Sequence, residues 1–273
     1  MATLAEIAQK ARLTLTPAPP GTARSMGLHL RDAVLGAFAP WTTQFEGYTP
    51  FMYTDKDGWV TTGIGNKIDP ISQALSLPWK IDGRPATQAE ITQAWNTVKS
   101  AWPGVQSFGS EKLTNMRLDA DGIRALVNHT LKSNDAAFAR SYPGYPSWPA
   151  DAQLASHSMA WAMGIGHIIP GGDFHSFIAA MSRNPPDFRA AADASHMDDR
   201  KNHGLVPRNE ANKLLFENAA RVLEGAGHPD VLYYLRDLGG SVVRAGSTKK
   251  REIVTIVAVL VGAAVLLTSG GRR

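Results

Sequence analysis

Apolar residues recur at intervals of three and four along much of the chain, which is the spacing of one face of an α-helix. The first such segment covers residues 30–45, and Pro40 predicts a break inside it, because proline lacks the N–H that a helix interior needs. Thr87 and Glu90 have capping-box spacing and predict the start of another helix. Helices are expected over residues 30–45, 87–99, 118–131, 151–163, 174–181, 187–194 and 207–223.

One stretch near the N-terminal end has a β-type pattern instead. Residues 51–53 and 59–62 are short β-prone runs that flank Asp55-Lys56-Asp57-Gly58, a sequence typical of a tight turn. This stretch predicts a hairpin, so the expected fold class is α+β and mostly α. Residues 14–27 are rich in Pro, Gly, Ser and Thr and predict a linker, and residues 140–149 predict a loop.

The C-terminal end is strongly apolar. The nineteen residues from Ile253 to Gly271 carry no charge and are mostly Val, Ile, Leu and Ala. This run is just long enough to cross a bilayer, which takes about 20 apolar residues. Basic residues at 249–251 and 272–273 favour a membrane but leave the orientation open. We expect one C-terminal transmembrane helix; the alternative is a buried core helix or a fibre-packing tail.

These patterns divide the chain into four parts. Residues 1–29 form an N-terminal arm and linker, and charges interrupt its first 13 residues, which therefore do not resemble a signal peptide. Residues 30–226 form the main domain, 227–252 a juxtamembrane segment and 253–271 the transmembrane helix.

The amino-acid composition excludes several kinds of catalytic and metal sites. The absence of cysteine excludes disulfides, thiol catalysis and cysteine-ligated zinc. The eight histidines form no His-Glu-x-x-His pattern, so a metalloprotease is not expected. The net charge of +4 suits an anionic partner, such as a cell envelope or a nucleic acid, and equally an ordinary basic protein. No Lys/Arg-rich stripe with interleaved aromatics is present, so no nucleic-acid partner is expected.

Two carboxyl groups and a hydroxyl group are expected near one another. Glu46 ends the first long helix, Asp55 begins the tight turn, and Thr61 lies on the returning strand. Inverting glycoside hydrolysis needs an acid and a base about 6.5–9.5 Å apart, with a water molecule beside the base. A threonine hydroxyl can hold that water. Gly63 and Gly65 would let the backbone bend close to a polysaccharide or to the helix.

The same residues resemble the phage-type lysozymes, glycoside hydrolase family 24. In that family a Glu is followed after eight residues by Asp, after five more by Thr, and then by a Gly-Ile-Gly run. Glu46, Asp55, Thr61 and Gly63-Ile64-Gly65 stand at those spacings. The resemblance implies a lysozyme-like two-lobed fold, with a small β-hairpin lobe and a helical lobe.

A weaker resemblance continues to about residue 223. Trp161 stands where the family has an aromatic residue in its cleft, although core packing would also explain it. The segment from Gly204 to Arg208 resembles the Gly-Leu-x-x-Arg helix start of the family, whose arginine pairs with the catalytic glutamate. The alternative for Arg208 is an ordinary surface arginine. Asn66 replaces a structural histidine of the family, and residues 101–119 look like an insertion near the hinge between the lobes.

The resemblance implies a muramidase that cleaves the β-1,4 bond between N-acetylmuramic acid and N-acetylglucosamine with inversion, in phage lysis or wall penetration. Glu46 would be the general acid, Asp55 the ionised base, and Thr61 the residue that positions water. Residues that would bind or orient the substrate are Gly63, Gly65, Trp161 and Arg208. No metal or cofactor is required. The expected partners are bacterial peptidoglycan and a membrane, in the host cell envelope or the virion.

Two other functions stay open at this point. A lytic transglycosylase would cut the same bond without water, and would need Glu46 but neither Asp55 nor Thr61. A membrane-anchored structural protein could bind peptidoglycan without cutting it. The presence of all three candidate catalytic residues favours hydrolysis. The side of the membrane on which the main domain lies is not determined by the sequence.

Overall fold

A computed structural model of the chain describes residues 18–200 and 202–234. Helices dominate it, and the two small antiparallel sheets make the fold α+β and mostly helical. The helices are α2 (Thr22–Ser25), α3 (Asp32–Glu46), α4 (Ile71–Leu75), α5 (Gln88–Ala101), α6 (Ala120–Ser141), α7 (Ala150–Met163), α8 (His175–Met181), α9 (Phe188–Ala194) and α10 (Val206–Arg221). Short 3-10 helices cover Ser107–Leu113, Tyr145–Ser147, Ile165–His167 and His203–Leu205, and a π-helical turn covers Val222–Ala226.

Each sheet has three short strands. The first sheet has the order β1-β2-β3, formed by β1 (Thr49–Thr54), β2 (Val60–Gly63) and β3 (Asn66–Lys67). The second has the order β5-β4-β6, formed by β4 (Lys80–Ile81), β5 (Arg84–Pro85) and β6 (Met116–Arg117). The predicted hairpin is confirmed as β1 and β2, with Tyr53 opposite Thr61.

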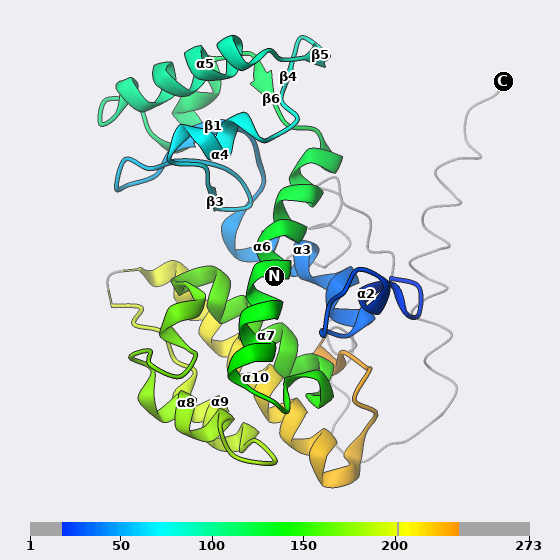
Figure 1. Cartoon of the computed structure of the whole chain (residues 1–273). Coiled ribbons are helices and arrows are strands. Elements are labelled where there is room, and N and C mark those ends of the chain that lie inside the picture. Colours follow the sequence, from blue (N-terminus) through cyan, green and yellow to red (C-terminus); the bar gives the residue numbers. More distant parts are fainter. Residues whose placement is uncertain (1–17, 201, 235–273) are drawn as a thin grey trace, which may run out of the picture.

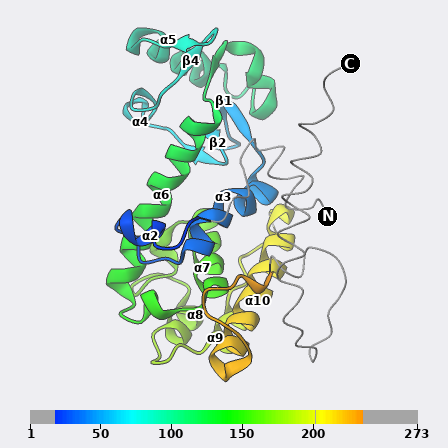
Figure 2. The same cartoon turned by 90° about the vertical axis from the view of Figure 1, so that its right-hand side faces the viewer.

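The two sheets and helices α7 to α10 lie at opposite ends of the molecule. Figure 1 shows both sheets with α4 and α5 at one end, and α7 to α10 at the other. Helix α6 runs between the two ends, and Figure 2 shows the same arrangement from the side. The end of α3 joins the helical part directly to β1, so Glu46 lies at the junction.

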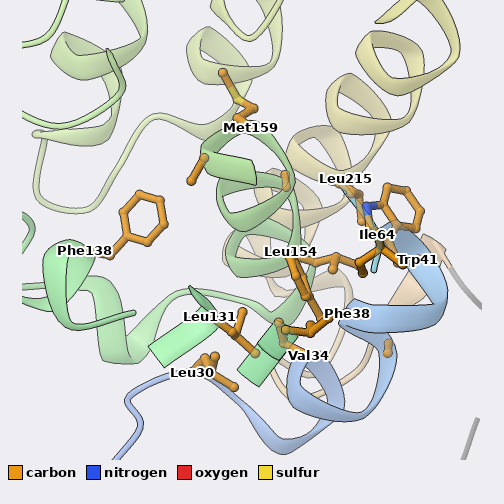
Figure 3. Close-up of a cluster of buried hydrophobic side chains, with 14 of the residues drawn as sticks. Leu30, Val34, Phe38, Trp41, Ile64, Leu131, Phe138, Leu154, Met159 and Leu215 are labelled. Atoms are coloured by element: carbon orange, nitrogen blue, oxygen red, sulfur yellow. The ribbon is translucent and has the colours of Figure 1, made fainter. Parts of the chain in front are cut away.

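Helix α7 is the centre of the helical part. Its residues from Ala150 to Ala160 are all buried, including the polar side chains of Asp151, Gln153 and His157. Side chains from α3, α6 and α10 pack around it, as Figure 3 shows for Leu154 and its neighbours. The labelled members of this core are Leu30, Val34, Phe38, Trp41, Ile64, Leu131, Phe138, Leu154, Met159 and Leu215.

The predicted break at Pro40 is wrong. Helix α3 is continuous from Asp32 to Glu46 and contains Pro40 in its interior. Proline removes one helical hydrogen bond, but Phe38 and Trp41 on either side of it are completely buried. Tertiary packing of these rings outweighs the local cost and keeps the helix intact.

Other predicted helices exist, with shifted ends. The capping box of Thr87 and Glu90 is confirmed at the start of α5. Helix α6 continues ten residues beyond the predicted end at Leu131, to Ser141, so part of the predicted loop at 140–149 is helical. Asp119 caps its start by accepting a hydrogen bond from the backbone of Gly122.

Part of the predicted linker is folded. The single turn of α2 lies within residues 14–27, and the Asp32 carboxylate accepts hydrogen bonds from the backbone N–H groups of Gly21 (2.6 Å) and Ala23 (2.7 Å). The segment 101–119 contributes a 3-10 helix and strand β6, which completes the second sheet.

No helix among residues 18–200 and 202–234 is both long and apolar enough to cross a membrane. The predicted transmembrane helix at 253–271, most of the juxtamembrane segment and the start of the N-terminal arm lie outside the described residues.

Candidate active site

Glu46 is the last residue of α3. Gly47 ends the helix with φ of +74°, a conformation that favours glycine, and its N–H donates to the carbonyl of Thr43 (3.0 Å). The chain then enters β1 at Thr49. This local geometry places the Glu46 carboxyl group between the helical part and the first sheet, with 28% of the side chain exposed.

Arg208 holds one side of this carboxyl group. Its Nη2 lies 2.7 Å from Oε1 of Glu46, and its side chain is only 2% exposed. The guanidinium carbon also lies 4.8 Å from the ring centre of Phe45. Burial lowers the pKa of Arg208 and the Glu46 charge opposes that shift. Arg208 is a buried ion-pair partner, so the alternative of an ordinary surface arginine is wrong.

Gly65 lies on the other side of the Glu46 carboxyl group. A Cβ atom on Gly65 would lie 2.9 Å from Oε2 of Glu46, and its φ of +80° also favours glycine. The Glu46 carboxyl group is therefore confined between the guanidinium of Arg208 and the backbone of the β2–β3 turn. Gly63, with φ of +68°, allows the same turn to form.

Asp55 is fixed by the turn that it begins. Its Oδ1 accepts hydrogen bonds from the backbone N–H groups of Asp57 and Trp59, both at 2.9 Å. Its own N–H donates to the carbonyl of Trp59 (3.0 Å). No residue in the described ranges donates a hydrogen bond to Oδ2. One carboxylate oxygen is therefore used in structure, while the other can act on a substrate or water.

Thr61, like Asp55, is hydrogen-bonded to the backbone of Trp59. Its hydroxyl donates to the Trp59 carbonyl (3.2 Å), and the side chain is buried. Because the hydroxyl proton is used in this way, Oγ1 can accept a hydrogen bond from a water molecule. The backbone of Trp59 thus holds both Asp55 and Thr61 in place.

Tyr53 is influenced by the charges of both acidic residues and was not singled out from the sequence. Burial, followed by the charges of Glu46 and Asp55, raises its pKa to about 12. Its hydroxyl is thus within electrostatic reach of both carboxyl groups and stays protonated at neutral pH. Hairpin register could have found it, because Tyr53 faces Thr61 across the strands.

Trp161 lies beside the glycine turn. Its indole N–H donates to the carbonyl of Ile64 (3.0 Å), and its ring packs edge-on against Phe38 at 5.3 Å. The side chain is half-buried. Its two contacts connect α7 and α3 to the turn that carries Gly63 and Gly65. Both contacts are structural.

Asn66 supports the same turn. Its side chain is buried, and Oδ1 accepts a hydrogen bond from the Ile64 N–H (3.3 Å). The same oxygen would lie 2.9 Å from a Cβ on Gly63. Asparagine therefore provides a hydrogen bond to the turn at the position where the family has histidine.

Within the part of the chain that the structure describes, no three His, Asp or Glu residues gather in a way that could hold a metal ion. No protein-family model matches the chain, and no curated protein matches it either. We therefore infer the function from the motif and from the geometry of its residues.

Proposed function

We propose that this chain is a peptidoglycan hydrolase with a lysozyme-like two-lobed fold, a muramidase that cleaves the β-1,4 bond between N-acetylmuramic acid and N-acetylglucosamine. The observation that carries the proposal is the 2.7 Å ion pair between Glu46 and the buried Arg208, at a helix end that leads directly into the hairpin whose turn holds Oδ1 of Asp55. Burial, followed by the charges of Glu46 and Asp55, raises the pKa of Tyr53, in agreement with this arrangement. Glycoside hydrolysis requires two carboxyl groups on either side of the scissile bond.

Glu46 acts as the general acid in this mechanism. Its proton goes to the glycosidic oxygen as the bond from that oxygen to the anomeric carbon breaks. Arg208 does not touch the sugar; it fixes the direction of the carboxyl group through the 2.7 Å ion pair. Gly65 leaves room for that group beside the turn.

Asp55 and Thr61 bind and orient the attacking water molecule. Oδ2 of Asp55 and Oγ1 of Thr61 each accept one hydrogen of a water molecule, which directs the lone pair of the water oxygen at the anomeric carbon. The new carbon–oxygen bond forms on the face opposite the leaving group, and Asp55 takes the released proton. The product has inverted configuration, and solvent returns the proton from Asp55 to Glu46.

The sequence outside the described residues favours attachment to a membrane. We propose that residues 253–271 anchor the enzyme in a membrane of the host envelope or the virion. The enzyme would then act on peptidoglycan next to that membrane, during phage lysis or wall penetration.

The decisive test uses purified peptidoglycan and the full chain. Glu46→Gln and Asp55→Asn should each lower turnover by about 10³-fold, because each removes a proton-transfer group. Glu111→Gln is the matched control, since this exposed glutamate lies in the 3-10 helix at Ser107–Leu113 and faces Arg117 at 3.8 Å. Full activity of Glu46→Gln would exclude the assigned acid.

The products separate the alternatives. Reducing muramic acid ends that appear first as the α-anomer indicate hydrolysis with inversion. Anhydro-muramic ends would indicate a lytic transglycosylase. Binding to peptidoglycan without any release of fragments would indicate a structural protein.

A further inference from the structure

The hairpin turn carries an unusual pair of exposed aromatic rings. The chain has seven tryptophans, and only Trp59 and Trp102 are exposed, by 43% and 42%. Large aromatic side chains are usually buried, because exposing them to water costs free energy. Two exposed indoles at one place therefore need an explanation beyond folding.

Both rings border the turn that holds Asp55. Trp59 ends this turn, and its N–H donates to the Asp55 carboxylate. Trp102 follows α5, and its indole lies against Gly58: a Cβ on Gly58 would be 3.0 Å from Cδ2 of Trp102. Segments distant in sequence thus bring two indoles to the same turn.

A lysine ammonium group completes the patch. Nζ of Lys67 lies 3.2 Å from the ring centre of Trp59 and has no carboxylate partner among the described residues. Lys99 is also near the ring, at 5.1 Å, but it bonds to Asp69 (2.6 Å) and to the carbonyl of Gly58 (2.8 Å). The Lys99 ammonium group therefore has partners within the protein, whereas the Lys67 ammonium group can bind a carboxylate of a ligand. The Trp59 ring is 43% exposed even with Lys67 over one of its faces.

We infer that Trp59, Trp102 and Lys67 form an additional binding site for the peptidoglycan strand, beside the site of cleavage. Indole faces stack on the C–H faces of pyranose rings, and an ammonium group suits a carboxylate. A peptidoglycan strand presents both, as sugar rings and as the carboxylates of its stem peptides. The inference rests on the proposed function, because the patch adjoins Asp55 and Thr61 through the backbone of Trp59.

The patch positions the strand and takes no part in proton transfer. A sugar stacked on Trp59 is tied to the turn that fixes Asp55 and Thr61, so binding there places the next linkage in register with Glu46. Loss of the patch should therefore weaken binding of long strands more than it slows cleavage of bound ones.

The test compares variants of the full chain on insoluble peptidoglycan. Trp59→Ala and Trp102→Ala should each raise KM and the co-sedimentation Kd by about tenfold, with a smaller change in kcat. Lys67→Gln should weaken binding to peptidoglycan with intact stem peptides, but not to chitin oligosaccharides, whose N-acetylglucosamine rings carry no carboxylate. Leu223→Ala is the control, because Leu223 is 48% exposed in the π-helical turn.

Binding and cleavage are measured separately, so the two ideas can fail separately. If the wild type cleaves peptidoglycan and the tryptophan variants bind it as tightly, the additional site is disproved while the function stands. If the wild type binds through Trp59 and Trp102 but never cleaves, the function fails and the site stands. Binding of single-stranded DNA that these variants abolish, with no binding to peptidoglycan, would overturn the inference in favour of a nucleic acid.

Discussion

Nη2 of Arg208 lies 2.7 Å from Oε1 of Glu46, so that the third residue of α10 is paired with the last residue of α3. Arg208→Met keeps a long side chain but removes this pair. The free carboxyl group should lose its fixed direction, and kcat should fall by about 10²-fold with little change in KM. The free energy of unfolding should fall by less than the roughly 3–5 kcal/mol that follows when a fully buried pair is broken, because the remaining Glu46 side chain is 28% exposed.

Initial rates on soluble peptidoglycan fragments, together with thermal unfolding, would check this prediction. Arg221→Met is the matched control, since Arg221 is exposed at the other end of the same helix. A variant at Arg208 with unchanged kcat would show that the ion pair has no role in catalysis.

Gly65 and Gly83 offer a pair of substitutions that separate strain from steric contact. Both have a φ near +80°, so alanine should destabilise the fold by about 1 kcal/mol at either position. Only at Gly65 would the new methyl group contact Glu46, at 2.9 Å from Oε2; at Gly83 nothing lies within 4 Å. Gly65→Ala should therefore lower kcat by about tenfold or more, whereas Gly83→Ala should keep it. Denaturant unfolding and turnover on the same preparations test this, and equal activity losses would contradict it.

The local part of the site was predictable from the sequence. Asp55 and Thr61 follow from a turn between two β-prone runs, and Glu46 ends a helix because glycine follows it. These relationships span few residues, so pattern and turn chemistry determine them. The resemblance to a family was needed for Arg208, because nothing local to α10 indicates a partner on α3.

Tertiary packing explains what the sequence pattern missed. Pro40 predicts a helix break by its own chemistry, but the buried rings around it hold α3 together. The electrostatic coupling of Tyr53 to Glu46 and Asp55 depends on how α3 meets the hairpin, which no local pattern contains. The patch of Trp59 and Trp102 likewise appears only when the end of α5 is placed against Gly58.

The apolar C-terminal run makes a prediction about location. Deleting residues 253–273 should move the protein from the membrane fraction to the soluble fraction, since this uncharged run is mostly Val, Ile, Leu and Ala and is long enough to cross a bilayer. Activity on detergent-free peptidoglycan should persist, because the candidate site lies within residues 46–208. Fractionation and turnover assays check both parts. A truncated protein that stays in the membrane fraction would show that the anchor lies elsewhere.

A buried histidine predicts how stability depends on pH. His157 in α7 is completely buried, and its Nε2 lies 2.8 Å from the hydroxyl of Tyr145, which donates to Asp135 (3.0 Å). Nε2 must therefore carry the proton, and Nδ1 has no partner among the described residues. A second proton, on Nδ1, would make the ring positively charged and would have no hydrogen-bond acceptor. Burial, partly opposed by Asp135, lowers the pKa of His157 from 6.5 to about 4.

The unfolded chain binds a proton at His157 below pH 6.5, and the folded chain binds it only near pH 4. The contribution to the free energy of unfolding is therefore complete above pH 6.5 and is lost as the pH falls towards 4, by about 3 kcal/mol. His157→Gln should remove this part of the pH dependence, although it lowers stability at pH 7.5. His129→Gln, at an exposed position of α6, should keep the wild-type dependence. Urea unfolding between pH 4 and 7.5 measures the difference, and parallel curves for the wild type and His157→Gln would disprove the assignment.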